Sequence, residues 1–266
     1  MKRVLSAAAL WLGLAGAAVA APVCTLIADA GSGEILSRSG EQCGTPTSPA
    51  STFKVALALM GFDSGVLVDA NAPAWPYRED YATWNASWKK TTDPTIWMRD
   101  SVVWYSQVLT RTLGAEKFRH YVNKFKYGNR DISGNPGRDD GLTRAWLSSS
   151  LKITPEQQII FLTKLWNRQL PVSSEAVDKT FAVMPRFPLA DGWKAYGKTG
   201  SGFQEGANGG VDRTKQFGWF IGWAIKGDRS ILFARLIKDD GPDESPAGVR
   251  ARDGMLADLP GLLAAH

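Results

Sequence analysis

The amino-acid sequence predicts a mixed α/β (α+β) fold, in which an antiparallel sheet flanked by N- and C-terminal helices carries an all-helical insertion. Strand-like alternation occurs near both ends of the chain, in residues 25–37 and again between 193 and 238. The residues between these two regions show helical periodicity instead. Strands from both ends can join one sheet, which makes the helix-rich middle an insertion.

The chain begins with a leader-like segment. Its first residues are basic, residues 4–19 are apolar, and small residues follow. This order is typical of a secretory signal peptide, and the apolar stretch is too short and too rich in Ala and Gly for a membrane span. We expect residues 1–20 to be removed and residues 21–266 to act in the periplasm as one domain without a stable membrane anchor. Its expected parts are a sheet lobe, about 21–50 and 190–266, and a helical lobe, about 51–189.

The two cysteines flank a predicted β-hairpin. Residues 25–28 and 34–37 alternate around a Gly-containing turn, which places Cys24 opposite about position 40. A disulfide between Cys24 and Cys43 is therefore geometrically plausible in an oxidising compartment, and two free buried thiols are the alternative.

The middle of the chain is predicted as helices separated by two loops. Residues 71–93 are rich in Trp, Pro, Asn and Thr without either period, and residues 127–140 are polar with several Gly and Pro. Thr154 followed by Pro155 is typical of a helix start. The expected helices are 51–60, 96–113, 115–125, 155 to about 167, and 173–181.

The last third of the chain is predicted as strands followed by one helix. Residues 217–225 alternate bulky side chains with mostly small ones, so that a helix could pack closely on the small face. The other expected strands are 193–200 and 230–238, and the amphipathic helix is about 247–263.

The tetrad Ser-x-x-Lys begins at Ser51, Ser87 and Ser149. Its chemistry needs the serine and lysine one helical turn apart, so that the amine can reach the hydroxyl. Only Ser51 starts a convincing helix, because Ser87 lies in the Trp-rich loop and Ser149 precedes the break at Thr154. Taken alone, the tetrad at Ser51 is better explained by a helix-capping serine and a surface lysine.

A second element, Lys198-Thr199-Gly200, falls at the end of the expected strand 193–200 and precedes Ser201 and Gly202. A lysine and a threonine before glycines can hold a substrate carboxylate while the bare backbone approaches closely. The alternative is an ordinary strand end with a turn.

Four motifs occur together in one order along the chain: Ser51-Thr-Phe-Lys54, Ser101-Val-Val103, Tyr127-Gly-Asn129 and Lys198-Thr-Gly200. Together with Trp146-Leu147 and the segment 217–223, they resemble the class D (oxacillinase-type) serine β-lactamases, which belong to the penicillin-recognising enzymes. The resemblance implies a β-lactamase/transpeptidase-like fold over nearly all of residues 24–266. Small residues follow Gly200 here, whereas many members of the family carry a bulkier one.

The resemblance implies that Ser51 opens the β-lactam of penicillin-type antibiotics, and that N-carboxylated Lys54 is the general base for acylation and deacylation. An ordinary lysine, with a pKa of about 10.4, is protonated at pH 7 and cannot react with CO2. Burial therefore has to lower the pKa of Lys54 to about 7. CO2 or bicarbonate is then required, and no separate cofactor and no metal are expected.

The resemblance also assigns the remaining site residues. Trp146 donates its indole N–H to the carbamate, and Val103 helps to keep the pocket dry. Ser101 relays a proton towards the lactam nitrogen, and the backbone N–H groups of Ser51 and Ser201 form the oxyanion hole. The residues expected to hold the substrate or shape the site are Lys198, Thr199, Gly200, Tyr127, Asn129 and Arg250, with Arg252 as the alternative to Arg250.

Other classes fit the sequence less well. Only His120 and His266 occur, without Gly-x-Ser-x-Gly, so a Ser-His-Asp hydrolase lacks its base, and two Cys with two His make no credible zinc site. The basic residues behind the net charge of +5 are scattered, which predicts no nucleic-acid partner. A D,D-peptidase or transpeptidase and a non-hydrolysing β-lactam sensor stay as alternatives. The expected partner is a small β-lactam, and the protein is a monomer or a homodimer.

Overall fold

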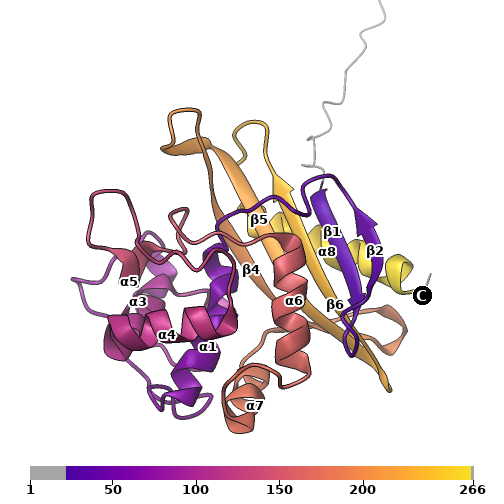
Figure 1. Cartoon of the computed structure of the whole chain (residues 1–266), viewed down its shortest axis with the longest axis horizontal. Helices are drawn as coiled ribbons and strands as arrows, with labels where there is room; N and C mark the ends of the chain where they lie inside the picture. Colours follow the sequence, from indigo (N-terminus) through magenta and orange to yellow (C-terminus); the bar gives the residue numbers. More distant parts are fainter. Residues whose placement is uncertain (1–21, 265–266) are drawn as a thin grey trace, which may run out of the picture.

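The computed structural model describes residues 22–264, so the predicted signal peptide, residues 1–20, lies outside the described residues. One six-stranded antiparallel sheet runs through the molecule in the order β2-β1-β6-β5-β4-β3 (Figure 1). The mixed fold with an antiparallel sheet is confirmed. The strands are β1 (Pro22–Asp29), β2 (Ile35–Ser39), β3 (Arg186–Pro188), β4 (Lys194–Glu205), β5 (Val211–Lys226) and β6 (Arg229–Lys238).

Helices cover both faces of the sheet (Figure 1). One of them, α6, comes from the range assigned to the helical lobe but lies against β1 and β6. On the opposite face, α8 packs over β5 and β4. The helices are α1 (Lys54–Asp63), α2 (Pro94–Asp100), α3 (Val103–Leu113), α4 (Ala115–Phe125), α5 (Gly141–Arg144), α6 (Pro155–Trp166), α7 (Ser174–Ala182) and α8 (Ala247–Ala264), with 3-10 turns at Ala50–Phe53, Ala86–Trp88 and Ala190–Gly192.

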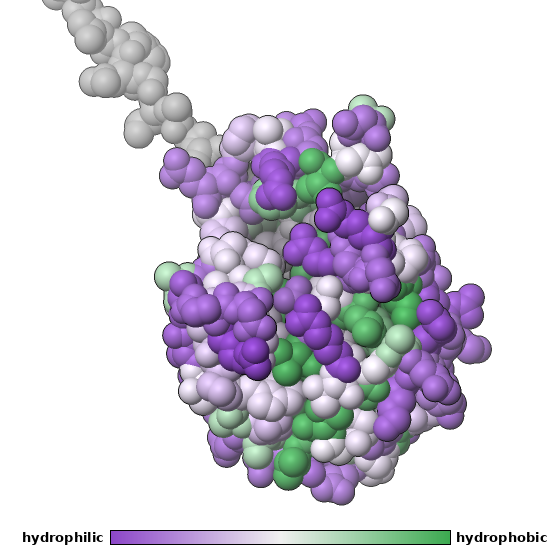
Figure 2. Space-filling model, turned by 90° about the vertical axis from the view of Figure 1, so that its left-hand side faces the viewer, coloured by the Kyte–Doolittle hydropathy of each residue, from purple (hydrophilic) through white to green (hydrophobic). Residues whose placement is uncertain are grey.

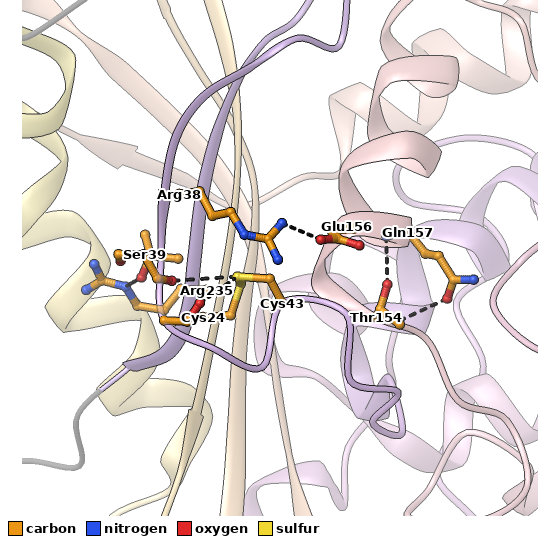
Figure 3. Close-up of a disulfide and its surroundings, with 10 residues drawn as sticks. Cys24, Arg38, Ser39, Cys43, Thr154, Glu156, Gln157 and Arg235 are labelled. Atoms are coloured by element: carbon orange, nitrogen blue, oxygen red, sulfur yellow. Dashed lines mark hydrogen bonds and ion pairs between the residues drawn. A yellow bond between two sulfur atoms is a disulfide. The ribbon is translucent and has the colours of Figure 1, made fainter.

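A disulfide joins Cys24 of β1 to Cys43, as the hairpin register predicts (Figure 3). Thr25 pairs with Ser39, so the antiparallel register places residue 40 opposite Cys24, three residues before Cys43. The same hairpin reaches α6 through an ion pair between Arg38 and Glu156. The disulfide thus fastens β1 to the segment after β2, and the ion pair attaches the hairpin to α6.

The predicted helix 96–113 is wrong in one respect, because it is two helices. Ser101 ends α2 in the left-handed conformation, with φ 60° and ψ 32°, and α3 begins at Val103. This conformation is uncommon for a residue with a side chain and breaks the helical hydrogen-bond pattern. The apolar periodicity continues across the break, which is why the sequence pattern does not show it.

Two strands are longer than predicted. β4 continues past Gly200 to Glu205, and β5 begins at Val211, so the two form a hairpin beyond the expected strand ends. Lys198-Thr-Gly200 therefore lies inside a strand and not at a strand end before a turn. The added residues are largely Gly, Ser and polar, and backbone pairing with a neighbouring strand holds them where side-chain alternation gives no signal.

The sheet separates two apolar cores. The bulky face of β5, which includes Trp219 and Trp223, packs with the helical part, and the small face packs against α8. A Cβ at Gly218 would collide with the backbone of Ala247, so glycine permits the close approach of α8. The expectation that a helix packs on the small face of this strand is confirmed.

The surface on the side of the helical lobe is largely hydrophilic, with apolar residues in patches between polar ones (Figure 2). The exposed large apolar residues are far apart in the sequence: Ile35, Val68, Trp84, Ile160 and Val211. No helix within residues 22–264 combines the length and apolar character needed to cross a membrane.

Candidate active site

Ser51 lies in a tight turn that leads directly into α1. The turn Ala50–Phe53 is 3-10, and Ala50 has a positive φ of 48°, which is strained for a residue other than glycine. Thr52 holds the turn, because its hydroxyl donates to Pro49 O over 2.7 Å and accepts from the side chain of Gln158 in α6 over 3.1 Å. Contacts from a distant helix therefore fix the position of the Ser51 backbone.

Lys54 is completely buried one helical turn after Ser51. Its Nζ lies 3.1 Å from Ser51 Oγ, and no carboxylate within residues 22–264 forms an ion pair with it. Burial lowers the pKa of Lys54 well below its ordinary value, and the positive charge of Lys198 lowers it further. A lowered pKa favours the neutral amine, and a neutral amine can take a proton from Ser51 or react with CO2.

Aromatic side chains of the helical lobe enclose the turn Ala50–Phe53, which is called the nucleophile turn below after the predicted role of Ser51. The rings of Tyr127, Trp146 and Phe118 lie 5.0, 5.6 and 6.0 Å from the ring of Phe53. Trp146 is fully buried, and its indole Nε1 has no hydrogen-bond partner in the described part of the chain. A buried donor without a partner is costly, so this N–H fits an acceptor that the unmodified side chains do not supply.

Lys198 links the sheet to the helical lobe. Its Nζ donates to Ser101 Oγ over 3.0 Å and to the carbonyl of Thr199 over 3.1 Å, and Thr199 Oγ1 lies 3.4 Å away. Burial, followed by the charge of Arg252, lowers the pKa of Lys198 to about 7. The left-handed conformation of Ser101 and the strand β4 together bring a hydroxyl and an amine into contact.

Gly200 brings β4 against the nucleophile turn. A Cβ at this position would lie 2.9 Å from Pro49 O and 3.1 Å from Thr52 N. The next residue, Ser201, accepts a hydrogen bond from the N–H of Gly248 at the start of α8 over 2.8 Å. The structure thus brings together Ser51, Lys54, Ser101, Lys198, Thr199 and Gly200 at the junction of the sheet and the helical lobe.

Of three further predicted residues, Val103 and Tyr127 are buried and Asn129 is exposed. Val103 is buried at the start of α3, and Tyr127 is buried against Phe53. The side chain of Asn129 donates to Ser150 O and accepts from Lys152 N–H, so it fastens the loop after α5. These residues support the site through packing and loop geometry, and a direct contact with substrate stays a prediction.

The two arginines of α8 project in opposite directions, because residues two apart on a helix are about 200° apart. Arg250 forms a bidentate ion pair with Asp239, at 2.8 and 2.6 Å, and lies 3.4 Å from Asp243. Arg252 lies over the ring of Phe187 in β3 and acts on the pKa of Lys198 in β4. Arg250 therefore points away from Lys198 towards the end of β6, whereas Arg252 is on the side of Lys198.

Among residues 22–264, no group of three or more His, Cys, Asp or Glu side chains could hold a metal ion. The donors at the junction are serine hydroxyls, lysine amines and one indole, which suit acyl transfer and anion binding better than metal binding.

Comparisons with known proteins agree with this geometry. Residues 23–258 match the model of the penicillin binding protein transpeptidase domain family. Beta-lactamase OXA-9 of Klebsiella pneumoniae is 44% identical over 244 residues, which are 90% of this chain and 88% of that protein. The crystal structure of the OXA-427 class D β-lactamase is 48% identical with a TM-score of 0.86, over 91% of this chain and 98% of the other. This chain belongs to the class D β-lactamase family.

The class D β-lactamase fold is shared with a receptor. The C-terminal domain of the Bacillus licheniformis BlaR penicillin-receptor superposes with a TM-score of 0.76 at 25% identity, covering 91% of this chain and 90% of that domain. In this class D β-lactamase, Ser48 is buried three residues before Ser51 and Asp239 is buried directly after β6, and neither was predicted as a site residue. A lone serine in a loop and a lone aspartate after a strand form no sequence motif, because their contacts are with other elements of the fold. The partners of Ser48 are about 100 or more residues away, and the partner of Asp239 is Arg250 in α8.

Proposed function

We propose that this class D β-lactamase hydrolyses the β-lactam amide of penicillin-type antibiotics through an acyl-enzyme on Ser51, and so confers resistance to them. The observation that carries the proposal is the buried Lys54, with its Nζ 3.1 Å from Ser51 Oγ and its pKa far below the ordinary value. A base at this distance can take the serine proton as the oxygen attacks the lactam carbonyl.

In the acylation step, the serine oxygen bonds to the carbonyl carbon and the lactam C–N bond breaks. The backbone N–H groups of Ser51 and Ser201 stabilise the oxyanion, where losing one donor typically costs about 3 kcal/mol. The leaving nitrogen needs a proton, and the pair of Ser101 and Lys198 can supply it. The pKa of Lys198, at about 7, suits a group that gives and regains a proton near neutrality.

Deacylation needs a base that can activate water, and we propose that Lys54 provides it after carboxylation by CO2. The neutral amine bonds to the carbon of CO2 and releases one proton, which leaves an anion with two acceptor oxygens. The fully buried site and the unpartnered indole N–H of Trp146 support this assignment, since the indole can donate to such an oxygen. No other cofactor is needed for the step.

The substrate carboxylate would lie beside Lys198, Thr199, Gly200 and Ser201. Two observations favour Arg252 over Arg250 as the additional anchor: the bidentate pairing of Arg250 with Asp239, and the effect of Arg252 on Lys198. We also propose that residues 1–20 are a signal peptide and that the mature protein acts in the periplasm as a monomer or a homodimer. The disulfide supports the location, because such bonds persist in oxidising compartments.

Turnover of a chromogenic β-lactam separates a hydrolase from a sensor. We expect purified residues 21–266 to hydrolyse nitrocefin continuously in the presence of bicarbonate, and the Ser51→Ala variant to show neither burst nor turnover. A burst of one equivalent followed by no further hydrolysis would contradict the proposal. It would favour a β-lactam sensor such as the BlaR domain, or a peptidase.

Bicarbonate dependence tests the proposed base. We expect activity to fade in CO2-free buffer at low pH, because protons favour the free, protonated amine, and to return when bicarbonate is added. Activity that does not respond to bicarbonate would rule out carboxylation of Lys54 while leaving Ser51 as the nucleophile.

A further inference from the structure

Ser48, three residues before the nucleophile, holds two separate parts of the fold together. Its hydroxyl donates to Trp146 O over 2.8 Å and accepts from the N–H of Ser148 over 3.0 Å. Its own carbonyl accepts from the indole N–H of Trp219 in β5 over 2.9 Å. Only 2% of Ser48 is exposed, so water cannot readily replace these bonds.

The residue before Ser48 strengthens the same connection. Thr47 and Ile153 exchange two backbone hydrogen bonds, of 3.0 and 2.9 Å, as a short antiparallel bridge. Ser148 is held with a positive φ of 52°, and its hydroxyl accepts from the N–H of Phe203 in β4 over 3.1 Å. The loop that carries Trp146 is therefore attached at both of its ends to the segment that leads into Ser51.

We propose that Ser48 is a positioning residue that sets the place of the Trp146 indole, and through it how firmly the carboxylated Lys54 is held. The proposal rests on the carboxylation proposed above. Because the single hydroxyl binds the backbone on both sides of Leu147, its removal frees the Trp146 carbonyl and the Ser148 N–H together. The Trp146 ring would keep its packing against Phe53. The hydrogen bond to the Trp146 carbonyl would be lost, so the backbone would no longer fix the direction of the indole N–H.

The loop provides a matched control for this role. Ser149, the residue after Ser148, also has a buried hydroxyl, but this hydroxyl has no hydrogen-bond partner within residues 22–264. Ser48→Ala and Ser149→Ala make the same chemical change in the same region, and only the first removes hydrogen bonds. Ser48→Thr keeps the hydroxyl and serves as the conservative rescue.

The experiment titrates bicarbonate against nitrocefin turnover for each variant. We expect Ser48→Ala to need about tenfold more bicarbonate for half-maximal kcat, which is the effect typical of losing a buried hydrogen bond, and to regain kcat at saturation. Ser149→Ala and Ser48→Thr should stay close to the parent protein. With 13C-labelled bicarbonate, the carbamate signal of Ser48→Ala should appear only at correspondingly higher concentration.

The possible outcomes are distinct. A folded Ser48→Ala variant with parental bicarbonate dependence would overturn the role of Ser48 and leave the proposed function intact. A parent protein without a carbamate signal or bicarbonate response would overturn both. If Ser48→Ala does not fold, Ser48→Cys keeps the volume with only a weak donor and acceptor, and parental bicarbonate dependence in that variant would equally overturn the proposal.

Discussion

Two buried lysines give the site its dependence on pH. Lys54 and Lys198 both lose hydration on folding, and the charge of Lys198 opposes a charge on Lys54. Folding therefore favours the neutral amines, whereas in the unfolded chain both lysines stay protonated up to about pH 10.4. The same desolvation that lowers the pKa of both lysines thus reduces the free energy of unfolding at neutral pH.

Stability should rise with pH above neutrality because of Lys198. Its pKa is about 7 in the folded protein and about 10.4 in the unfolded chain, so between these values the unfolded state binds one more proton. One such proton raises the free energy of unfolding by up to about 1.4 kcal/mol per pH unit. The free energy of unfolding, measured with urea between pH 7 and 9, should rise less steeply with pH in Lys198→Met than in the parent protein. Lys194 is exposed, so Lys194→Met should keep the parental slope. Equal slopes in the two variants would contradict the assignment.

Trp146→Phe separates the indole N–H from the packing of the ring. The phenyl ring can still contact Phe53, but the donor is lost, so we expect kcat for nitrocefin to fall by about 10- to 100-fold at ambient CO2 and to recover partly with bicarbonate. The control is Trp84→Phe, since Trp84 is 63% exposed on the surface. An unchanged kcat in Trp146→Phe would show that the indole nitrogen is not needed.

At the level of elements, α8 uses one arginine for structure and leaves another beside the site. Arg250 fastens the start of α8 to Asp239 after β6, and only 5% of the Asp239 side chain is exposed. Arg252, on the other side of α8, neighbours β3 and β4. Arg252 also pairs with Asp253 of the same helix over 2.8 Å, but this pair is more exposed than that of Arg250 with Asp239. We therefore expect Arg252, and not Arg250, to be available to an anionic substrate.

These two arginines should differ in what they affect. Arg250→Ala leaves Asp239 buried without its partner, so we expect a loss of about 3 kcal/mol in the free energy of unfolding with a small change in KM. Arg252→Ala should instead raise KM for a β-lactam that carries a carboxylate, with little effect on stability. Urea unfolding and steady-state kinetics on both variants measure this, and a large rise in KM for Arg250→Ala alone would restore Arg250 as the anchor.

Most elements could be predicted from local sequence, and the exceptions have long-range causes. The helix Ala115–Phe125 has strong periodicity and agrees with its prediction at both ends. Ser101, at the break between α2 and α3, accepts a hydrogen bond from Lys198, which is 97 residues away, and the short strand β3 pairs with β4 at the edge of the sheet. The orientations of Arg250 and Arg252 likewise needed Asp239, a partner outside their own helix.

On the scale of the whole molecule, the reaction site is a contact between two parts of the fold. The helical part contributes the turn with Ser51, and the sheet contributes β4 with Lys198, Thr199 and Gly200. Neither part holds the complete set of groups proposed for the reaction, so we expect activity to depend on the distance between them.

Gly200→Ala should change this distance without changing any reacting group. The added methyl would lie 2.9 Å from Pro49 O, so β4 and the nucleophile turn must move apart by some tenths of an ångström or more. We expect kcat/KM for nitrocefin to fall about 100-fold, because small misplacements of catalytic groups are costly. Gly241→Ala, where no atom lies within 4 Å, is the control, and equal activities would contradict this account.

The position of β1 inside the sheet has a consequence for the order in which the protein can fold. The disulfide closes a loop between residues only 19 apart, so the hairpin of β1 and β2 can be fastened soon after it exists. The other edge of β1 pairs with β6, about 200 residues later in the chain, and contacts this distant form slowly. The β1 edge of this locally closed hairpin therefore stays unpaired until residues 229–238 are available to cover it.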